Sequence, residues 1–465
     1  MNKKSILCLI SMVLLAGCGN QNTINNSADE NKECHLQFYV YDNGTQYKRM
    51  ANQFNLLHPN WHIEVRESAV QYFENLQNYF SADMAPDIFY MEPGEIAPFV
   101  RDGLILNIQS FIENGEDLKE EDLWPANDGY RYNQETKTFG EGDLYALAKD
   151  LSADYVMVYN KDHIVEYNKN HPVSLKDEIN YPSDDGIFPS ETIPMTWEQN
   201  ERFCEKLSIK DGDSFKRYGT VFDYTPWRHT IEWVQQQGET IFSEDGTKFN
   251  AESQAVIDAF THLTNYCYGD HVSSIPLDVA SVGTKSGFKS QSISVVWAGR
   301  WSFNAYNWDE CEFDIGLAPG PVKNAGDKIY ATTNYVGLSI SSTCKEPAVA
   351  YKFLEYLQTA GVRQEIRNGD SFNVPANKTI AMSETYTNVE DPFQKRLNNY
   401  FIKLTEIAEP LKWSPYINTT TFENDIAISY GHTWDNTSSY LTPAQALLQA
   451  KARIENDIRL VMDRM

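Results

Sequence analysis

Residues 85–112 read APDIFYMEPGEIAPFVRDGLILNIQSFI, in which a short apolar run precedes a loop and a helical segment. The run DIFYM, Asp87–Met91, is rich in β-favouring side chains and predicts a strand that ends before Glu92. Upstream, strands and helices are expected in turn at 35–42, 45–59, 62–68 and 70–83. This β-α-β-α-β order predicts an α/β protein with a parallel sheet wrapped by helices, and ligands bind such sheets beyond the carboxyl ends of the strands.

The same alternation continues through the rest of the chain, whose 465 residues exceed what one core usually serves and predict two lobes. Two helix starts are clear: Thr196 and Gln199 have the spacing of a capping box, and Thr442 is an N-cap candidate. Further strands are expected at 154–160, 218–224, 293–299 and 334–340, and further helices at 196–209, 250–267, 346–361 and 442–465.

Composition narrows the kinds of partner. The formal charge of -26 argues against nucleic acid as a ligand, because the protein would repel the phosphates along the whole binding surface. It also disfavours docking of the protein surface on anionic lipid. Aromatic residues make up 13% of the chain, an excess that suggests a surface for a ligand with flat apolar faces.

The N-terminus has the features of a targeting segment. Lys3 and Lys4 precede the apolar run SILCLISMVLLAG, and LLAGCGN then resembles the bacterial lipobox. The resemblance implies that residues 1–17 are a signal peptide, that cleavage precedes Cys18, and that lipid on Cys18 anchors the protein to a membrane. The alternative is an ordinary secretory peptide with an incidental cysteine. Residues 18–33 are polar and are expected to form a flexible tether.

Motifs for catalysis or metal binding are missing from the sequence. It contains no nucleophile elbow, zinc-protease helix, phosphate loop or dinucleotide fingerprint. The nine histidines do not cluster at ligand spacing, and Pro59 denies His58 and His62 a shared helical face. The five cysteines after Cys18 are scattered, so one disulfide is possible but cannot be assigned. We therefore expect no metal and no cofactor, although 65 acidic residues leave a glycosidase-like carboxylate pair open.

Taken in order, several segments resemble the extracellular solute-binding proteins of ABC importers, in the carbohydrate-binding group that includes maltose-binding protein. The strongest is 85–112, with its Pro-Asp strand, loop, helix and Gly-Leu step. Two departures stand out: Ala148 replaces a usual Pro, and Arg300 stands where Pro or a small residue is common. The other matching segments are FNLLHPNWHIEV at 54–65, LYALAKDLSADYVMVYNKD at 144–162, MTWEQNERFCEKL at 195–207, GFKSQSISVVWAGRW at 287–301 and KEPAVAYKFLEYLQTAGVRQEI at 345–366.

The resemblance implies a two-lobed, periplasmic-binding-protein-like α/β fold whose hinge-linked sheets close on a ligand. Lobe 1 would comprise 34–151 with 293–336, and lobe 2 would comprise 152–292 with 337–465. It also implies a non-catalytic, monomeric receptor on the extracytoplasmic face of a bacterial membrane, which passes a carbohydrate, expected to be an oligosaccharide, to an ABC permease. A carbohydrate-active hydrolase, or a ligand sensor or adhesin without a transport role, stays open as an alternative.

A sugar needs aromatic platforms for its apolar faces and planar polar side chains for its hydroxyl rim. Trp301 matches the family's stacking tryptophan, whereas Trp297 lies within a strand and is expected in the core. Arg300 could fork onto hydroxyls or onto the carboxylate of an acidic sugar. The expected ligand contacts are Tyr41, Asp42, Asn43, Glu92, Asp223, Tyr224, Trp227, Arg228, Arg300, Trp301, Asn334, Tyr335, Phe372 and Asn373.

Overall fold

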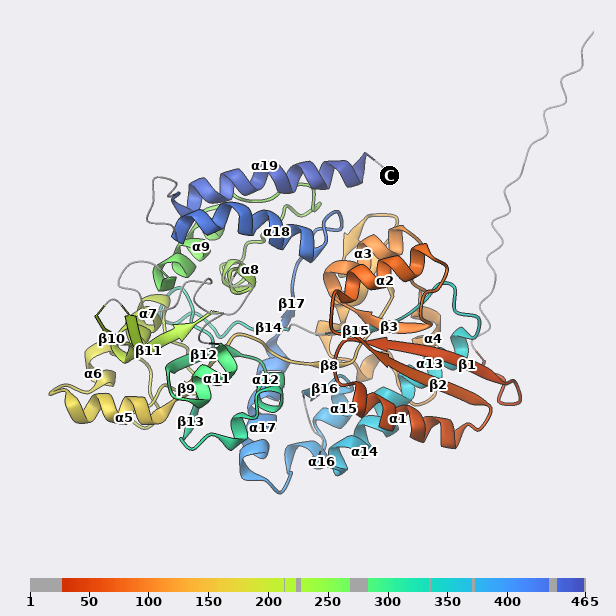
Figure 1. The fold of residues 1–465 in the computed structure, drawn as a ribbon, viewed down its shortest axis with the longest axis horizontal. Coiled ribbons are helices and arrows are strands. Elements are labelled where there is room, and N and C mark those ends of the chain that lie inside the picture. The colour runs from red at the N-terminus through yellow and green to blue at the C-terminus, as the bar shows by residue number, and fades with distance from the viewer. Residues whose placement is uncertain are drawn as a thin grey trace, which may run out of the picture.

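Two five-stranded sheets, each wrapped by helices, form two lobes that lie side by side (Figure 1). The computed structural model describes residues 27–212, 214–222, 227–267, 283–333, 336–369, 373–434 and 441–463. The predicted α/β fold with two lobes is confirmed. Within the described residues, no helix combines the length and the apolarity needed to cross a membrane.

The first sheet has the strand order β2-β1-β3-β15-β7. Strand β1 runs parallel to both β2 and β3, so the three predicted strands end at the same edge, and β15 is antiparallel to β3. Its strands are β1 (Cys34–Val40), β2 (Trp61–Glu67), β3 (Ile88–Met91), β7 (Leu147–Ala148) and β15 (Gly337–Ile340). Its helices are α1 (Gly44–Leu57), α2 (Tyr72–Ser81), α3 (Pro93–Arg101), α4 (Gln109–Glu113), α13 (Pro347–Tyr356) and α14 (Val362–Arg367).

The second sheet has the order β10-β11-β12-β9-β13. This sheet has a second hydrophobic core, which includes Trp297, Phe222 and Trp233. Its strands are β9 (Val156–Asn160), β10 (Ile209–Asp211), β11 (Ser214–Val221), β12 (Ile293–Ala298) and β13 (Ile315–Ala318). The helices around it are α5 (Lys161–Asn170), α6 (Leu175–Ile179), α7 (Trp197–Leu207), α8 (Trp227–Gln235), α9 (Gln254–Cys267), α11 (Thr284–Lys289), α12 (Arg300–Ala305), α18 (Thr419–Tyr430) and α19 (Pro443–Met462).

Strand pairing corrects the expected lobe boundaries. Residues 293–336 were expected in lobe 1, but β12 and β13 both pair with β9 of the second sheet. Residues 337–465 were expected in lobe 2, but β15 pairs with β3 and β7 of the first sheet. Helices α18 and α19, in contrast, do lie in the lobe of the second sheet, where α19 packs on α9 (Figure 1).

The segments that connect the two sheets pair with each other. Strand β8 (Asp150–Leu151) is antiparallel to β16 (Val374–Pro375), and β14 (Thr332–Thr333) is parallel to β17 (Glu409–Pro410). These ladders lie between the lobes in Figure 1, and helices α15 to α17 lie below them in that view. The helices there are α15 (Lys378–Ala381), α16 (Glu384–Thr387) and α17 (Pro392–Ile407).

The prediction of a flexible tether over residues 18–33 is only partly correct, because the last residues of this segment dock on lobe 1. The indole nitrogen of Trp61 donates to the carbonyl of Asp29 at 3.3 Å, and Asn60 donates to the carbonyl of Glu30 at 2.9 Å. Lys32 forms an ion pair with Glu346. Polar composition alone did not indicate that these backbone carbonyls would find partners on the lobe.

Candidate functional site

Four of the expected contact residues follow β1 and β3 at the shared edge of the first sheet. Tyr41 is half-buried, with its ring edge-on to Tyr72 at 5.1 Å and to Tyr90 at 5.0 Å. Asn43 has φ of 55° in the left-handed region and stands before α1. Glu92 precedes α3 in extended conformation. Parallel pairing therefore brings Tyr41, Asp42, Asn43 and Glu92 to one edge, as predicted.

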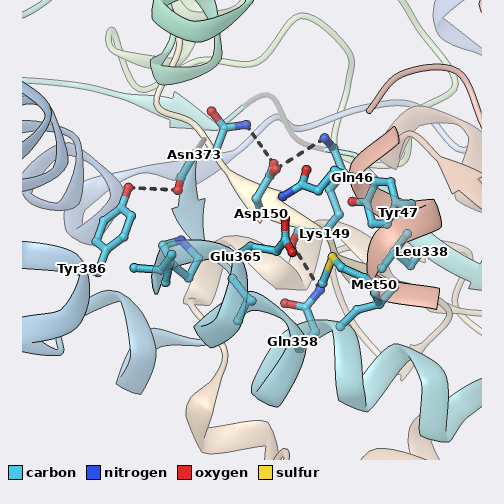
Figure 2. A pocket seen from close by; sticks show the side chains of 14 residues that line it. Gln46, Tyr47, Met50, Lys149, Asp150, Leu338, Gln358, Glu365, Asn373 and Tyr386 are labelled. Carbon is cyan, nitrogen blue, oxygen red and sulfur yellow. Dashed lines mark hydrogen bonds and ion pairs between the residues drawn. The ribbon is translucent and has the colours of Figure 1, made fainter. Parts of the chain in front are cut away.

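A charged pocket lies behind this edge, where α1, α14 and the β8–β16 ladder meet (Figure 2). The Lys149 ammonium lies 3.3 Å from an Asp150 oxygen and 3.8 Å from Asp42 Oδ1. Burial opposes its charge, but Asp150 and Asp42 raise the pKa of Lys149 above its ordinary value. Asn373 donates to Asp150 Oδ1 at 3.0 Å, so this expected contact residue is tied to the connecting strand.

A second groove lies between the two lobes. Glu92, Pro93 and Gly94 line it from the first sheet, and Trp413, Phe422 and Glu423 line it from the helices over the second. The Trp413 ring is held edge-on to Phe422 at 5.1 Å, and its nitrogen donates to the Ile417 carbonyl at 2.7 Å. An aromatic wall with carboxylates at the rim suits a ligand that has apolar faces and hydroxyl edges.

Glu95 joins the lobes next to this groove, since it follows the lining residue Gly94 and bonds to the lining residue Thr419. Its side chain is 2% exposed, and Thr419 of α18 donates to its carboxyl at 3.5 Å. Burial, together with the charge of Glu92, raises the pKa of Glu95 to about 8 despite the bonds from Thr419. The carboxyl therefore carries a proton at neutral pH while the lobes are in contact.

Trp301 lies at the start of α12 and is 39% exposed. Its nitrogen donates to Asp154 Oδ1 at 3.2 Å, and Asp154 follows Ala153, which bridges to the groove residue Thr333. The turn before it requires glycine, because a Cβ on Gly299 would lie 1.9 Å from Asp154 Oδ1. An exposed indole held beside the connecting segments is available as a platform.

Trp297 is 9% exposed and stacks on Phe222 with ring centroids 5.9 Å apart, which confirms the prediction that it belongs to the core.

The position of Arg300 contradicts the expectation that this residue contacts the ligand. The residue is fully buried, and its guanidinium donates to Asn398 Oδ1 at 3.1 and 3.3 Å and to Gln394 Oε1 at 2.6 Å. Its backbone nitrogen donates to Ser152 Oγ at 2.8 Å. The start of α12 turns the side chain onto α17, where it fastens the two helices together instead of facing a ligand. The argument for an acidic sugar therefore loses its basis.

The remaining expected residues are described only in part or not at all. Trp227 and Arg228 begin α8, of which only the backbone is described there. Five expected contacts lie outside the described residues: Asp223, Tyr224, Asn334, Tyr335 and Phe372.

Several site residues were missed in the sequence. Tyr155 has φ of 60°, rare for a bulky residue, and its ring lies 4.1 Å from that of His229. Trp413 could have been noticed as an aromatic in a loop before the N-cap Asn418. Lys149 gave no signal, because only the fold brings Asp42 to it.

Some buried polar atoms near these residues have no hydrogen-bond partner within the described part of the chain. They include His229 Nδ1, Trp297 Nε1 and Thr333 Oγ1. Burial lowers the pKa of His229 to about 3, so its ring is neutral. Of these three residues, Thr333 lines the interlobe groove, where a polar ligand can satisfy its hydroxyl.

Solved structures with the same fold are numerous. An ABC substrate-binding protein from Listeria monocytogenes in complex with cycloalternan shares 20% identity with a TM-score of 0.72, over 93% of this chain and 100% of that one. The maltose/maltodextrin-binding domain from Bdellovibrio bacteriovorus bound to maltotriose shares 16% with a TM-score of 0.68, over 91% and 100%. The sugar-binding protein MalE from Xanthomonas citri shares 14% with a TM-score of 0.72, over 93% and 100%.

At these identities the likeness establishes the fold. No curated protein matches the chain. The pattern of the family described as bacterial extracellular solute-binding protein matches residues 40–364, well over half of the sequence. The chain therefore belongs to the bacterial extracellular solute-binding proteins, as the resemblance of its segments predicted.

Proposed function

We propose that this protein is the lipid-anchored substrate-binding component of an ABC importer and that it captures an oligosaccharide for delivery to the permease. The observation that carries the proposal is the interlobe groove, which takes one wall from each lobe and combines Trp413 with the carboxylates of Glu92 and Glu423. Structural relatives include proteins in complex with cycloalternan and with maltotriose, which supports an oligosaccharide.

The proposed contacts comprise three groups. One follows the strand ends of the first sheet, one follows those of the second, and one lies on the connecting segments. Their members are Tyr41, Asp42, Asn43, Glu92, Asp223, Tyr224, Trp227, Arg228, Trp301, Asn334, Tyr335, Phe372, Asn373 and Trp413. Ligand contacts to both lobes would select the closed arrangement, which is how such a receptor signals that it is loaded.

The decisive experiment screens neutral and acidic oligosaccharides by thermal shift, with calorimetry on each hit. A matching saccharide should raise the melting temperature with the logarithm of its excess over Kd and should be recovered intact. Cleaved sugar after long incubation would favour the hydrolase reading instead.

Trp301→Ala should weaken binding of that saccharide about tenfold or more, as truncation of an aromatic hot spot does. The ligand-free melting temperature should change little, because the indole is 39% exposed. Ile428→Ala on α18, where the side chain is 59% exposed, is the matched control and should bind as the wild type does. Unchanged affinity in Trp301→Ala would remove Trp301 from the site.

A further inference from the structure

Two histidines meet on the open face of the first sheet, far from the interlobe groove. Strands β1 and β2 pair in parallel register, which sets His35 directly opposite His62. Their rings stack with centroids 4.7 Å apart and planes inclined at 24°. The sequence separates them by 27 positions, so the expectation that no histidines cluster is wrong at this place.

Glu33 completes a three-residue group. One of its carboxylate oxygens lies 3.4 Å from His35 Nε2, and the possible ligand atoms of Glu33, His35 and His62 all lie within 4.8 Å of one another. The side chains of His35 and Glu33 are 71% and 74% exposed, so they can turn freely. Within the described residues, the nearby cations are engaged elsewhere, Lys32 with Glu346 and Arg66 with Gln37.

Two imidazoles and one carboxylate are a ligand set that zinc and its neighbours in the transition series prefer, whereas magnesium and calcium prefer oxygen alone. Ligand atoms on one tetrahedral zinc stand about 3.3 Å apart, given bonds of about 2.0–2.1 Å. Rotation of exposed side chains closes the remaining gap without any movement of the strands. Cys34 does not take part, because alternation along β1 turns it to the buried face.

We propose that Glu33, His35 and His62 form a binding site for a divalent transition-metal cation of the zinc type, with water in the fourth position. Such an ion would join Glu33, the last residue before β1, to His62 on β2. It would thereby fasten the docked segment 29–33 to the lobe. The site is independent of the carbohydrate groove, and neither proposal depends on the other.

The test is calorimetric titration of zinc chloride into the chain without its leader and without any affinity tag. One zinc should bind, and the same titration with magnesium chloride should give no heat of binding. His35→Ala and His62→Ala should each weaken zinc binding at least tenfold, and Glu33→Gln severalfold. His171→Ala is the matched control, because His171 is an exposed histidine stacked on Tyr167, and it should leave the affinity unchanged.

Each variant should keep the metal-free melting temperature, since the side chains changed are exposed or partly exposed. Zinc should raise the melting temperature of the wild type and of His171→Ala but not that of His35→Ala. Wild-type zinc affinity in both His35→Ala and His62→Ala, or no zinc binding by the wild type, would overturn the proposal.

Discussion

Glu95 shows how a single residue links the protonation state to the contact between the lobes. It is nearly inaccessible, and its bonding partner Thr419 belongs to the opposite lobe. The folded protein holds the proton up to a pH of about 8, whereas an unfolded chain releases it near the ordinary value of 4.5. Between these values the folded state binds more protons, so this residue makes stability fall as pH rises, by up to roughly 1.4 kcal/mol per pH unit.

Glu95→Gln removes that dependence and keeps a side chain of the same shape. We expect the variant to gain stability relative to the wild type as pH rises from 5 to 8, with no further gain above that range. Urea unfolding at several pH values measures the difference, and Glu74→Gln on the exposed face of α2 is the control. A constant difference between wild type and Glu95→Gln from pH 5 to 8 would contradict the assignment.

Elements with a strong local signal were predictable, and their caps show why. The predicted capping box at Thr196 and Gln199 forms, and so does the predicted N-cap at Thr442, which is part of a second capping box with Gln445.

Thr442→Ala removes the bond from the Gln445 nitrogen and should cost about 1 kcal/mol of stability in denaturant unfolding. Gln449→Ala, at an exposed position of the same helix, should be nearly neutral. An equal loss in both variants would mean that the cap contributes nothing specific.

Elements whose place depends on distant residues were not predictable. The apolar pattern indicated that 293–298 is a strand, but only its pairing with β9 and β11 decides its sheet. Arg300 follows a glycine turn and was expected to contact the ligand, yet its partners lie 94 and 98 positions away on α17. Likewise, register alone places His35 against His62. Local sequence carries periodicity and caps, whereas these three features arise from tertiary packing.

For the whole molecule, the proposed lipid on Cys18 would decide whether the protein stays at the membrane. The family is extracytoplasmic, and the lipid on Cys18 is a proposal from the sequence. Cys18→Ser should move the protein from the membrane fraction to the medium or periplasm, because acyl chains supply the membrane affinity. Saccharide affinity of the released protein should be unchanged, since the groove lies between the lobes. Retention of Cys18→Ser in the membrane fraction, resistant to high salt, would argue against the anchor.

The docking of Asp29 and Glu30 on lobe 1 also limits the length of chain between Cys18 and the folded lobe. With an anchor at Cys18, at most eleven residue steps separate the lipid from Asp29, a contour of about 40 Å or less. Had the chain been free as far as Cys34 at the start of β1, the contour would have been nearly half as long again, about 58 Å. If Cys18 carries the proposed lipid, a connection of this length would hold the protein close to the bilayer and raise its effective concentration at a membrane partner. The corner formed by β1 and β2 would then face the membrane whenever the connecting chain is fully extended.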